Sequence, residues 1–259
     1  MPVWIGTSGW QYRDWRGQFY PPALRQAGWL EHYAERFRVV EVNNAFYRLP
    51  EAETFAAWAR RTPDDFVVGV KASRYLTHIR RLHEPEEAVA RFLERARHLG
   101  PKLGPVLLQL PPTLPADHDA LAGTLACFPG DVRVAVEFRH DSWFTEETQA
   151  LLRRHDAAFC LADSPKRRMP LWRTASWGYV RLHEGRSSPR PCYGRAALAG
   201  WAGRLAELFA AGDDVYAFFN NDPRGCAVRD AQRFAGAVER VGLVPTRVAS
   251  WREVSVARA

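Results

Sequence analysis

The chain contains 259 residues with a formal net charge of +7, and 47% of them are hydrophobic, so it can bury a substantial core. No apolar run approaches the roughly 20 residues that a membrane span needs, and the first residues lack the charged and apolar regions of a secretory signal. These features exclude a membrane-spanning protein and predict a soluble one.

The cysteines and the basic residues give weaker indications. The four cysteines show no CxxC spacing, and at least Cys160 falls inside a buried strand pattern. We therefore expect reduced, buried thiols at Cys127, Cys160, Cys192 and Cys226, without a disulfide scaffold or a structural zinc, as fits a cytoplasmic location. Nearly all basic residues are arginine, which can reflect coding bias, so the total charge is weak evidence for nucleic-acid binding.

Eight short runs of β-branched or aromatic residues recur along the chain at intervals of roughly 25 to 35 residues, as repeated βα units require. Each run ends in polar residues. The predicted strands are 3–6, 39–43, 66–71, 105–110, 133–138, 158–163, 177–183 and 215–221.

Segments with helical periodicity lie between most of these strands. Apolar stripes predict helices over 29–37, over 89–99 after an entry at Pro85, over 201–209 and over 228–238. Glycines follow three of them, at Gly100, Gly212 and Gly242. Residues 164–176 contain two prolines and no stripe, so one helix should be missing between strands six and seven.

Alternation of strands and helices implies a parallel sheet, and about eight units imply a closed barrel. We therefore predict an irregular TIM-like (β/α) barrel that forms one domain over residues 1–259. An open doubly wound sheet is the alternative. It would usually carry a glycine-rich dinucleotide turn after the first strand, and Gly6-Thr7-Ser8-Gly9 is too short to be one.

Polar side chains at the strand ends form the candidate site, because the C-terminal face of such a barrel carries the active site. The catalytic candidates are Glu41, Lys71, Glu137, Asp163 and His183. The substrate-binding candidates are Ser8, Trp10, Tyr12, Asn43, Asn44, Arg74, His78, Gln109, Arg139, His140, Arg181, Asn220, Asn221 and Asp222.

Strand parity indicates which of these point into the barrel. Side chains alternate between the barrel interior and the helix layer. Glu41 and Asn43 share one face of their strand, as do Glu137 with Arg139 and Arg181 with His183, while the apolar neighbours belong under the helices. Because isolated charges inside a barrel are costly, these groups must pair or face a wet cavity. Buried pairs that only fix the packing are the alternative for either glutamate taken singly.

Seven motifs occur in order along the chain and resemble one known family. They are Gly6-Thr7-Ser8-Gly9-Trp10, Glu41-Val42-Asn43-Asn44-Ala45-Phe46-Tyr47, Lys71-Ala72-Ser73-Arg74-Tyr75 with Thr77-His78, Gln109-Leu110-Pro111-Pro112, Glu137-Phe138-Arg139-His140 with Ser142-Trp143, Arg181-Leu182-His183, and Phe219-Asn220-Asn221-Asp222. Together they resemble the YecE-like family, domain of unknown function 72, over Val3 to about Val238. The resemblance implies a TIM-barrel-like fold of irregular strand or helix count and no established activity.

Two positions depart from the family pattern. The chain reads His183-Glu184-Gly185 where relatives often have His-Gly directly, which predicts a longer loop. Asp230 stands where an Asn is common. Both departures bear on loop contacts, not on the predicted network.

The loops after strands six and seven hold the densest basic stretch, which we assign to the site face. It consists of Lys166, Arg167, Arg168, Arg173, Arg181, Arg186, Arg190 and Arg195. It forms either a solvated loop or an anion-binding rim in which arginines hold phosphate. Aromatic residues in loops on the same side could stack on bases or sugars or form a capping core. They are Trp10, Tyr12, Trp15, Phe46, Tyr47, Tyr75 and Tyr193.

The first hypothesis is an enzyme, a hydrolase or lyase, that acts on an anionic or phosphorylated substrate such as a nucleic acid, a nucleotide or a sugar phosphate. Glu41 and Glu137 would serve as general acid and base, or jointly as ligands of a divalent ion, and His183 would carry a proton. We favour ion pairing over a metal, because Lys71 and Arg181 compete for the carboxylates and no HxH or HExxH spacing occurs. No cofactor is identified, and the oligomeric state is open.

Three other readings remain. Lys71 could form a Schiff base, provided that its amine is desolvated and unpaired. The chain could be a non-catalytic protein that binds DNA or RNA through the basic rim. A glycosidase-like enzyme would need the carboxyls of its two glutamates about 5 to 9.5 Å apart across an open cleft.

Overall fold

Eight parallel strands close into a barrel in the computed structural model, which describes residues 1–164 and 169–257. The strands are β1 Pro2–Thr7, β2 Val39–Val42, β3 Val67–Lys71, β4 Leu103–Gln109, β5 Val134–Glu137, β6 Ala158–Asp163, β7 Gly178–Leu182 and β8 Val215–Phe219. Neighbours in the chain are neighbours in the sheet from β2 to β8. All eight predicted strands are confirmed, with bounds that differ by at most two residues at either end.

The barrel closes through β1, which pairs with β8 along its length and with β2 at Thr7 and Val40. The start of β1 pairs instead with the two-residue strand β9 Val244–Pro245. The chain that follows β9 continues this contact, since Thr246 donates its backbone N–H to Val3 and accepts that of Ile5 on its hydroxyl. Residues 244–246 therefore fill the gap between β1 and β2 at the N-terminal end of β1.

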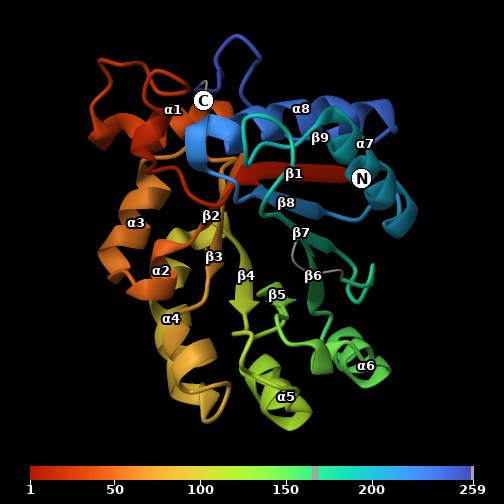
Figure 1. Cartoon of the computed structure of the whole chain (residues 1–259). Coiled ribbons are helices and arrows are strands. Elements are labelled where there is room, and N and C mark those ends of the chain that lie inside the picture. Colours follow the sequence, from red (N-terminus) through yellow and green to blue (C-terminus); the bar gives the residue numbers. More distant parts are fainter. Residues whose placement is uncertain (165–168, 258–259) are drawn as a thin grey trace.

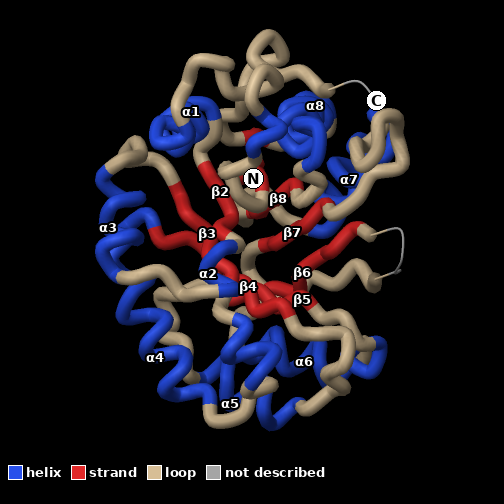
Figure 2. Tube along the Cα trace, turned by 60° about the vertical axis from the view of Figure 1, so that its left-hand side comes forward, coloured by secondary structure: helices blue, strands red, loops and turns tan. Residues whose placement is uncertain are grey.

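Helices surround the strands (Figure 1, Figure 2). They are α1 Trp29–Arg36, α2 Asn44–Tyr47, α3 Ala52–Arg60, α4 Pro85–Ala96, α5 His118–Ala126, α6 Glu146–Arg154, α7 Arg195–Leu208 and α8 Cys226–Arg240. Shorter helical turns are η1 Arg13–Trp15, η2 Gln26–Gly28, η3 Tyr75–Ile79, η4 Arg97–Lys102, η5 Asp141–Trp143 and η6 Pro223–Gly225. The four predicted helices are confirmed as α1, α4, α7 and α8. Of the connection between β6 and β7, the part that the structure describes contains no helix.

The apolar residues form two clusters that match the two faces of the strands. The larger cluster lies between the strands and the helices. The smaller one lies inside the barrel and includes Trp177, Tyr179, Tyr216 and Phe218. Their rings contact one another, with centroids 5.2 to 6.5 Å apart along the chain of neighbours. This aromatic layer fills the barrel interior near the N-terminal ends of the strands. The inward polar residues therefore lie at the C-terminal strand ends. We call this end of the barrel the mouth.

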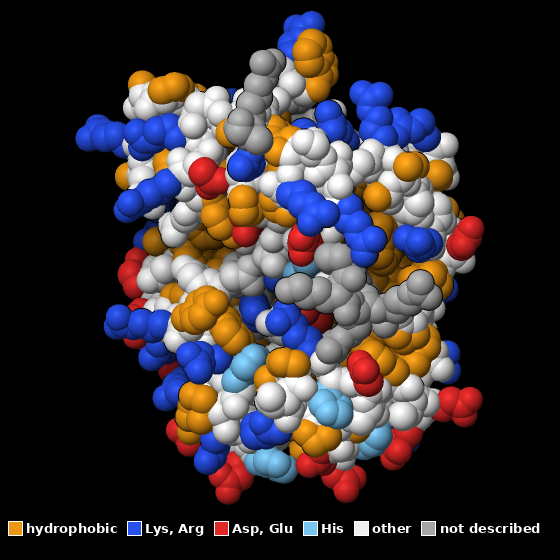
Figure 3. All heavy atoms as spheres, viewed as in Figure 1, with side chains coloured by type: hydrophobic (Ala, Val, Ile, Leu, Met, Phe, Trp, Pro, Cys, Tyr) orange, Lys and Arg blue, Asp and Glu red, His pale blue; other side chains and the backbone are white. Residues whose placement is uncertain are grey.

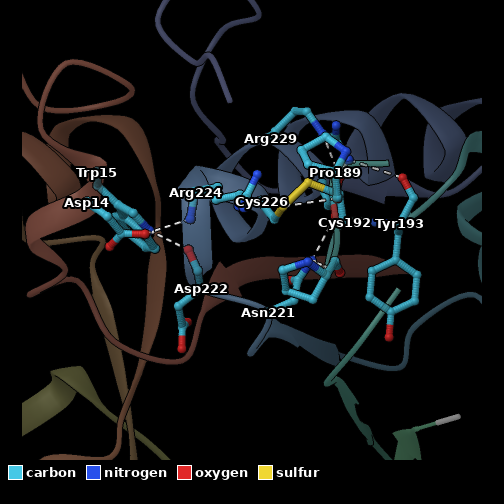
Figure 4. Close-up of a disulfide and its surroundings, with 12 residues drawn as sticks. Asp14, Trp15, Pro189, Cys192, Tyr193, Asn221, Asp222, Arg224, Cys226 and Arg229 are labelled. Carbon is cyan, nitrogen blue, oxygen red and sulfur yellow. Dashed lines mark hydrogen bonds and ion pairs between the residues drawn. A yellow bond between two sulfur atoms is a disulfide. The ribbon is translucent and has the colours of Figure 1, made fainter. Parts of the chain in front are cut away.

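The prediction of reduced cysteines is wrong for two of the four. Cys192, in the loop after β7, forms a disulfide with Cys226, the first residue of α8, 34 positions later (Figure 4). Cys127 and Cys160 are free thiols. The loop folds back over the start of α8 because Asp230 accepts hydrogen bonds from the Tyr193 backbone and from Asn221. The lack of CxxC spacing therefore did not exclude this disulfide. The expectation of reduced cysteines, which supported a cytoplasmic location, does not hold for Cys192 and Cys226.

The two departures from the family pattern lie in this same region. Gly185 packs against the part of the same loop that contains Cys192. The contact is so close that a Cβ atom at Gly185 would lie 2.2 Å from the Cys192 carbonyl oxygen. Asp230 is fully buried, and Arg229 pairs with it at 2.6 Å. The longer loop is thus held by Asp230 and the disulfide.

Candidate functional site

A buried arginine joins two buried glutamates inside the mouth. Arg181 of β7 donates from Nη1 to Glu137 Oε2 of β5 at 2.6 Å and from Nη2 to Glu41 Oε1 of β2 at 2.8 Å. The Tyr179 hydroxyl donates to the second oxygen of Glu41 at 2.5 Å. All four side chains are at most 2% exposed. The parity prediction for Glu41, Glu137 and Arg181 is confirmed, because all three point inward and meet.

Further polar groups surround Glu137 Oε1. Gln109 Nε2 donates to it at 2.8 Å and Arg139 Nε at 3.0 Å, while the Gln109 carbonyl oxygen accepts from Lys71 Nζ at 2.7 Å. His183 Nε2 lies 3.5 Å from the same oxygen. Asn220 Nδ2 lies 3.0 Å from His183 Nδ1. We name these nine residues the mouth network; they are Glu41, Lys71, Gln109, Glu137, Arg139, Tyr179, Arg181, His183 and Asn220.

The hydrogen bonds assign a tautomer to His183. An amide nitrogen can only donate, so Asn220 Nδ2 requires Nδ1 of the neutral ring to be an acceptor. The ring proton is then on Nε2, the atom that faces Glu137. The Nε2 proton thus points toward Glu137 across 3.5 Å, and Nε2 makes no hydrogen bond to any described residue.

Charges within the mouth network fix the glutamates as carboxylates. Burial alone would raise the pKa of Glu137, but attraction to Arg181, and then to His183, outweighs it and holds that pKa well below the usual range. The pKa of Glu41 is lowered in the same way, chiefly by Arg181. Two carboxylates thus face two guanidinium groups and one ammonium, and the network carries one excess positive charge before His183 is counted.

Two basic side chains at the mouth, Lys71 and His78, have lowered pKa values. Burial lowers the pKa of Lys71 to about 8, with repulsion from Arg181 as the next cause. Burial also lowers the pKa of His78 to about 4, and repulsion from Lys71, Arg139 and Arg74 adds to the effect. Lys71, Arg74 and Arg139 therefore create a local positive potential at the mouth, which keeps the His78 ring neutral.

Two cavities open at the mouth. One of about 350 Å³ is lined in part by Glu137, Arg139 and His183. The other, of about 140 Å³, is lined in part by Ser8, Tyr12 and Asn43. On the face drawn in Figure 3, blue Lys and Arg side chains occur with pale blue His side chains around a central hollow. The mouth thus offers space for a ligand beside the network.

The smaller cavity adjoins a carboxyl with an unusual pKa. Burial raises the pKa of Asp222 to about 7, although hydrogen bonding to Tyr12 and attraction to Arg181 oppose the rise. Asp222 Oδ1 is buried without a hydrogen-bond partner among the described residues. The Tyr12 hydroxyl also donates to the Ser8 carbonyl at 2.6 Å, and Asn43 Nδ2 donates to that same carbonyl at 3.1 Å.

Several predicted site residues have other roles in the structure. Asn221 donates to Asp230 and to the Pro191 carbonyl, on the side toward α8. His140 caps η5, where its Nδ1 accepts from the Ser142 backbone. Trp10 is 5% exposed and packs edge-on against Trp58. Asp163 is hydrogen-bonded to the buried Tyr193 hydroxyl, outside the mouth network. Asn44, the first residue of α2, and Arg74 are exposed.

Two contributors to the site are absent from the predicted set. Tyr179 lies two residues before Arg181 on the same strand face, so the parity that identified Arg181 also identifies Tyr179. Phe46 places its ring 3.9 Å from Lys71 Nζ. Phe46 was predicted only as a loop aromatic that stacks on a base or sugar or joins a capping core, but it lies in helix α2 and contacts Lys71.

The predicted basic rim is only partly at the mouth. Arg173 pairs with Asp213 at 2.8 Å, at the opposite end of the barrel, because residues 169–176 return from the end of β6 to the start of β7. Arg181 is buried in the network. Arg186, Arg190 and Arg195 are exposed. Lys166, Arg167 and Arg168 lie outside the described residues. The assignment of Arg173 and Arg181 to a surface rim is therefore wrong.

Most of the loop aromatics form a capping core. Trp10, Trp15, Phe46 and Tyr193 are buried, whereas Tyr47 is 75% and Tyr75 38% exposed. Tyr12 is partly buried and lines the smaller cavity at the mouth.

The described residues contain neither a cluster of metal-ligating side chains nor a helix that could span a membrane. No group of three or more His, Cys, Asp or Glu side chains there has metal-site geometry. None of the described helices combines the length and apolar character needed to span a bilayer.

Comparison with known proteins gives one consistent result. Residues 4–252 match the family model described as protein of unknown function DUF72. The chain is 34% identical over 154 residues to UPF0759 protein YecE of Escherichia coli K12, a match that covers 58% of this chain and 54% of that protein. It is 26% identical to UPF0759 protein YunF of Bacillus subtilis over 95% of this chain and 99% of that protein.

A solved structure extends this likeness to the fold. The crystal structure of a DUF72 family protein from Thermotoga maritima superimposes with a TM-score of 0.83 at 30% identity. The superposition covers 92% of this chain and 100% of that one. The barrel fold is thus shared with that relative.

Proposed function

The chain belongs to the DUF72 family of proteins of unknown function, and from the mouth network we propose that it is an enzyme acting on a small anionic or phosphorylated substrate. The observation that carries this proposal is the excess positive charge beside an open cavity. Arg139 uses Nε to bind Glu137, and its Nη1 and Nη2 make no hydrogen bond to any described residue. One guanidinium group can bind two oxygens of a phosphate at the same time. In this proposal, Arg139 therefore binds the anionic group of the substrate.

The residues divide into two roles. Glu41 is fully buried, with both oxygens occupied by Arg181 and Tyr179, so it positions Arg181. Glu137 and His183 both line the cavity, with His183 Nε2 3.5 Å from Glu137 Oε1. In this proposal His183 is the general acid or base, and Glu137 orients its ring.

The alternatives have less support. In a glycosidase, the sugar lies between the two carboxyls, but here the Arg181 guanidinium occupies that position. A nucleic-acid binder would need a continuous basic surface, and Arg173 and Arg181 do not contribute to one. A phosphorylated small molecule requires only Arg139 and its neighbours.

A binding measurement tests the anion site. We expect inorganic phosphate to bind the protein, and Arg139→Gln to weaken that binding by about tenfold or more, since a hydrogen bond to a charged group contributes about 1.5–3 kcal/mol. Isothermal titration calorimetry gives the affinity. NMR titration of His78 gives a second readout, because a bound anion would raise its lowered pKa.

Arg97→Gln provides the matched control. Arg97 is 51% exposed, compared with 41% for Arg139, and pairs with Asp131 beside a cavity at the opposite end of the barrel. Phosphate affinity should be unchanged in this variant. Equal loss in both variants, or none in Arg139→Gln, would contradict the proposed anion site.

A turnover measurement tests the role of His183. On a panel of phosphate esters and sugar phosphates, we expect His183→Asn to lower kcat about a hundredfold or more, the usual effect of losing a general acid or base. His140→Asn is the control, because His140 also follows a strand but caps a turn. Any substrate turned over equally by the unsubstituted protein and by His183→Asn would exclude this role.

A further inference from the structure

The amine of Lys71 is buried without a carboxylate partner. Lys71 ends β3 and is 8% exposed. Its Nζ donates to Gln109 Oε1 at 2.7 Å and lies 3.9 Å from the centre of the Phe46 ring. Within residues 1–164 and 169–257, no ion pair involves this nitrogen. The ammonium thus has one oxygen acceptor for three protons.

Lys102 shows what a stabilised buried ammonium looks like in the same chain. It is 7% exposed, and its Nζ donates to the carbonyl oxygens of Ala59 and Thr62 at 2.6 and 2.7 Å and lies 3.3 Å from the Thr62 hydroxyl. Three acceptors therefore surround that nitrogen. Equal burial with fewer acceptors makes the neutral amine easier to form at Lys71, although the ammonium still predominates at neutral pH. Burial and the charge of Arg181 lower the pKa of Lys71 to about 8, in agreement with this contrast.

Gln109 fixes the direction of the Lys71 amine. Glu137 can only accept, so the Gln109 amide nitrogen faces Glu137 and its carbonyl oxygen faces Lys71. Glu137 is in turn held by Arg181. One hydrogen bond therefore anchors the amine. Because this bond uses an N–H group, the lone pair of the neutral amine points away from Gln109. Gln109 is a positioning residue in this arrangement.

We propose that Lys71 is a nucleophile that forms a Schiff base with an aldehyde or ketone bearing an anionic group. The inference rests on the proposed function, because the same mouth supplies the anion contact through Arg139. It narrows the substrate class from any small anion to an anionic carbonyl compound.

The atoms of this step balance without a further reactant. The neutral Nζ attacks the carbonyl carbon, a C–N bond forms, and the carbonyl oxygen takes a proton as the nitrogen releases one. The resulting hydroxyl takes a second proton, which comes from solvent, and leaves as water. The product is a protonated imine, so one amine, one carbonyl and one proton give one iminium and one water.

Reductive trapping tests the inference on the unsubstituted protein. The protein is incubated with glyceraldehyde 3-phosphate, or with propanal as an uncharged aldehyde, in the presence of sodium cyanoborohydride. Peptide mass spectrometry then locates the adducts. The chain has only three lysines, Lys71, Lys102 and Lys166, so each site can be assigned. We expect at least tenfold more adduct at Lys71 than at Lys102, with a rate that rises with pH up to about 8.

The outcomes separate this inference from the proposed function. Strong labelling of Lys71 by the phosphorylated aldehyde and weak labelling by propanal, with the preference lost in Arg139→Gln, supports both. Equal labelling of Lys71 by both aldehydes supports the nucleophile and contradicts the anion site. Labelling of Lys71 no greater than that of Lys102, while phosphate still binds, overturns the Schiff base alone. Lys71→Met should abolish the Lys71 adduct, and circular dichroism checks that this variant is folded.

Discussion

Replacement of Arg181 by methionine is expected to lower the free energy of unfolding by about 3–5 kcal/mol at neutral pH, the usual cost of leaving buried charges without their partner. Glu41 would keep the Tyr179 hydroxyl, and Glu137 would keep Gln109 and Arg139. Urea denaturation followed by tryptophan fluorescence measures the change. The loss should shrink as the pH falls toward 5, because the buried carboxyls left without Arg181 can take up protons.

Two further variants separate charge from packing. Arg181→Met combined with Glu41→Gln should recover part of the loss, since it removes one of the uncompensated charges. Arg61→Met is the matched control. Arg61 lies 2.6 Å from Glu31, the same distance as Arg181 from Glu137, but both partners are about 40% exposed, so the expected loss is at most about 1 kcal/mol. A loss in Arg181→Met no larger than in this control would refute the buried network as a structural unit.

Asp222→Asn is expected to change how stability depends on pH. The folded pKa of Asp222 is raised to about 7 from an ordinary value of 3.8, so the folded state binds the proton more tightly than the unfolded state. The stabilisation from this group is complete below pH 4 and is lost as the pH rises toward 7. Relative to the unsubstituted protein, the Asn variant should therefore gain about 3 kcal/mol between about pH 5 and pH 8.

Thermal and urea unfolding at both pH values test this expectation. Asp64→Asn, at an exposed carboxyl, is the control and should follow the pH profile of the unsubstituted protein. Parallel pH profiles for the Asp222→Asn variant and the unsubstituted protein would mean that Asp222 is solvated and ionised. It would then have no special place at the mouth.

The strands could be predicted because each is a short apolar run that is buried on both faces of the sheet. Parity then placed Glu41, Glu137 and Arg181 inside the barrel, since a period of two leaves no other choice once the apolar face is known. The same rule applied to β7 would have added Tyr179. The family motifs contain these three residues, and the Thermotoga maritima relative shares the barrel fold.

Four helices were not identified: α2, which is a single turn, and α3, α5 and α6, each for a local reason. The helices α5 and α6 bury few apolar side chains; α6 buries only Leu151 and Leu152. Their starts carry better signals, because Asp117 and Thr145 accept hydrogen bonds from the backbone three residues later. The helix α3 buries just Phe55 and Trp58. Short stripes of this kind fall below what periodicity alone can detect.

The failures in the loops have a common physical cause. Cys192 and Cys226 meet because the loop after β7 folds over α8, which depends on tertiary contacts of Asp230 and not on spacing. Arg173 is displaced from the mouth because the chain must return to the other end of the barrel before β7 begins. Sequence density located both segments but could not give their paths.

A crystal structure with bound tungstate, a heavy-atom analogue of phosphate, tests the central claim most directly. The account predicts tungstate in the cavity lined by Glu137 and His183, within hydrogen-bond distance of the Arg139 guanidinium. An anion bound solely beside Arg97 and Arg133, in the cavity of about 520 Å³ at the opposite end of the barrel, would contradict it. So would a mouth that stays empty at saturating tungstate.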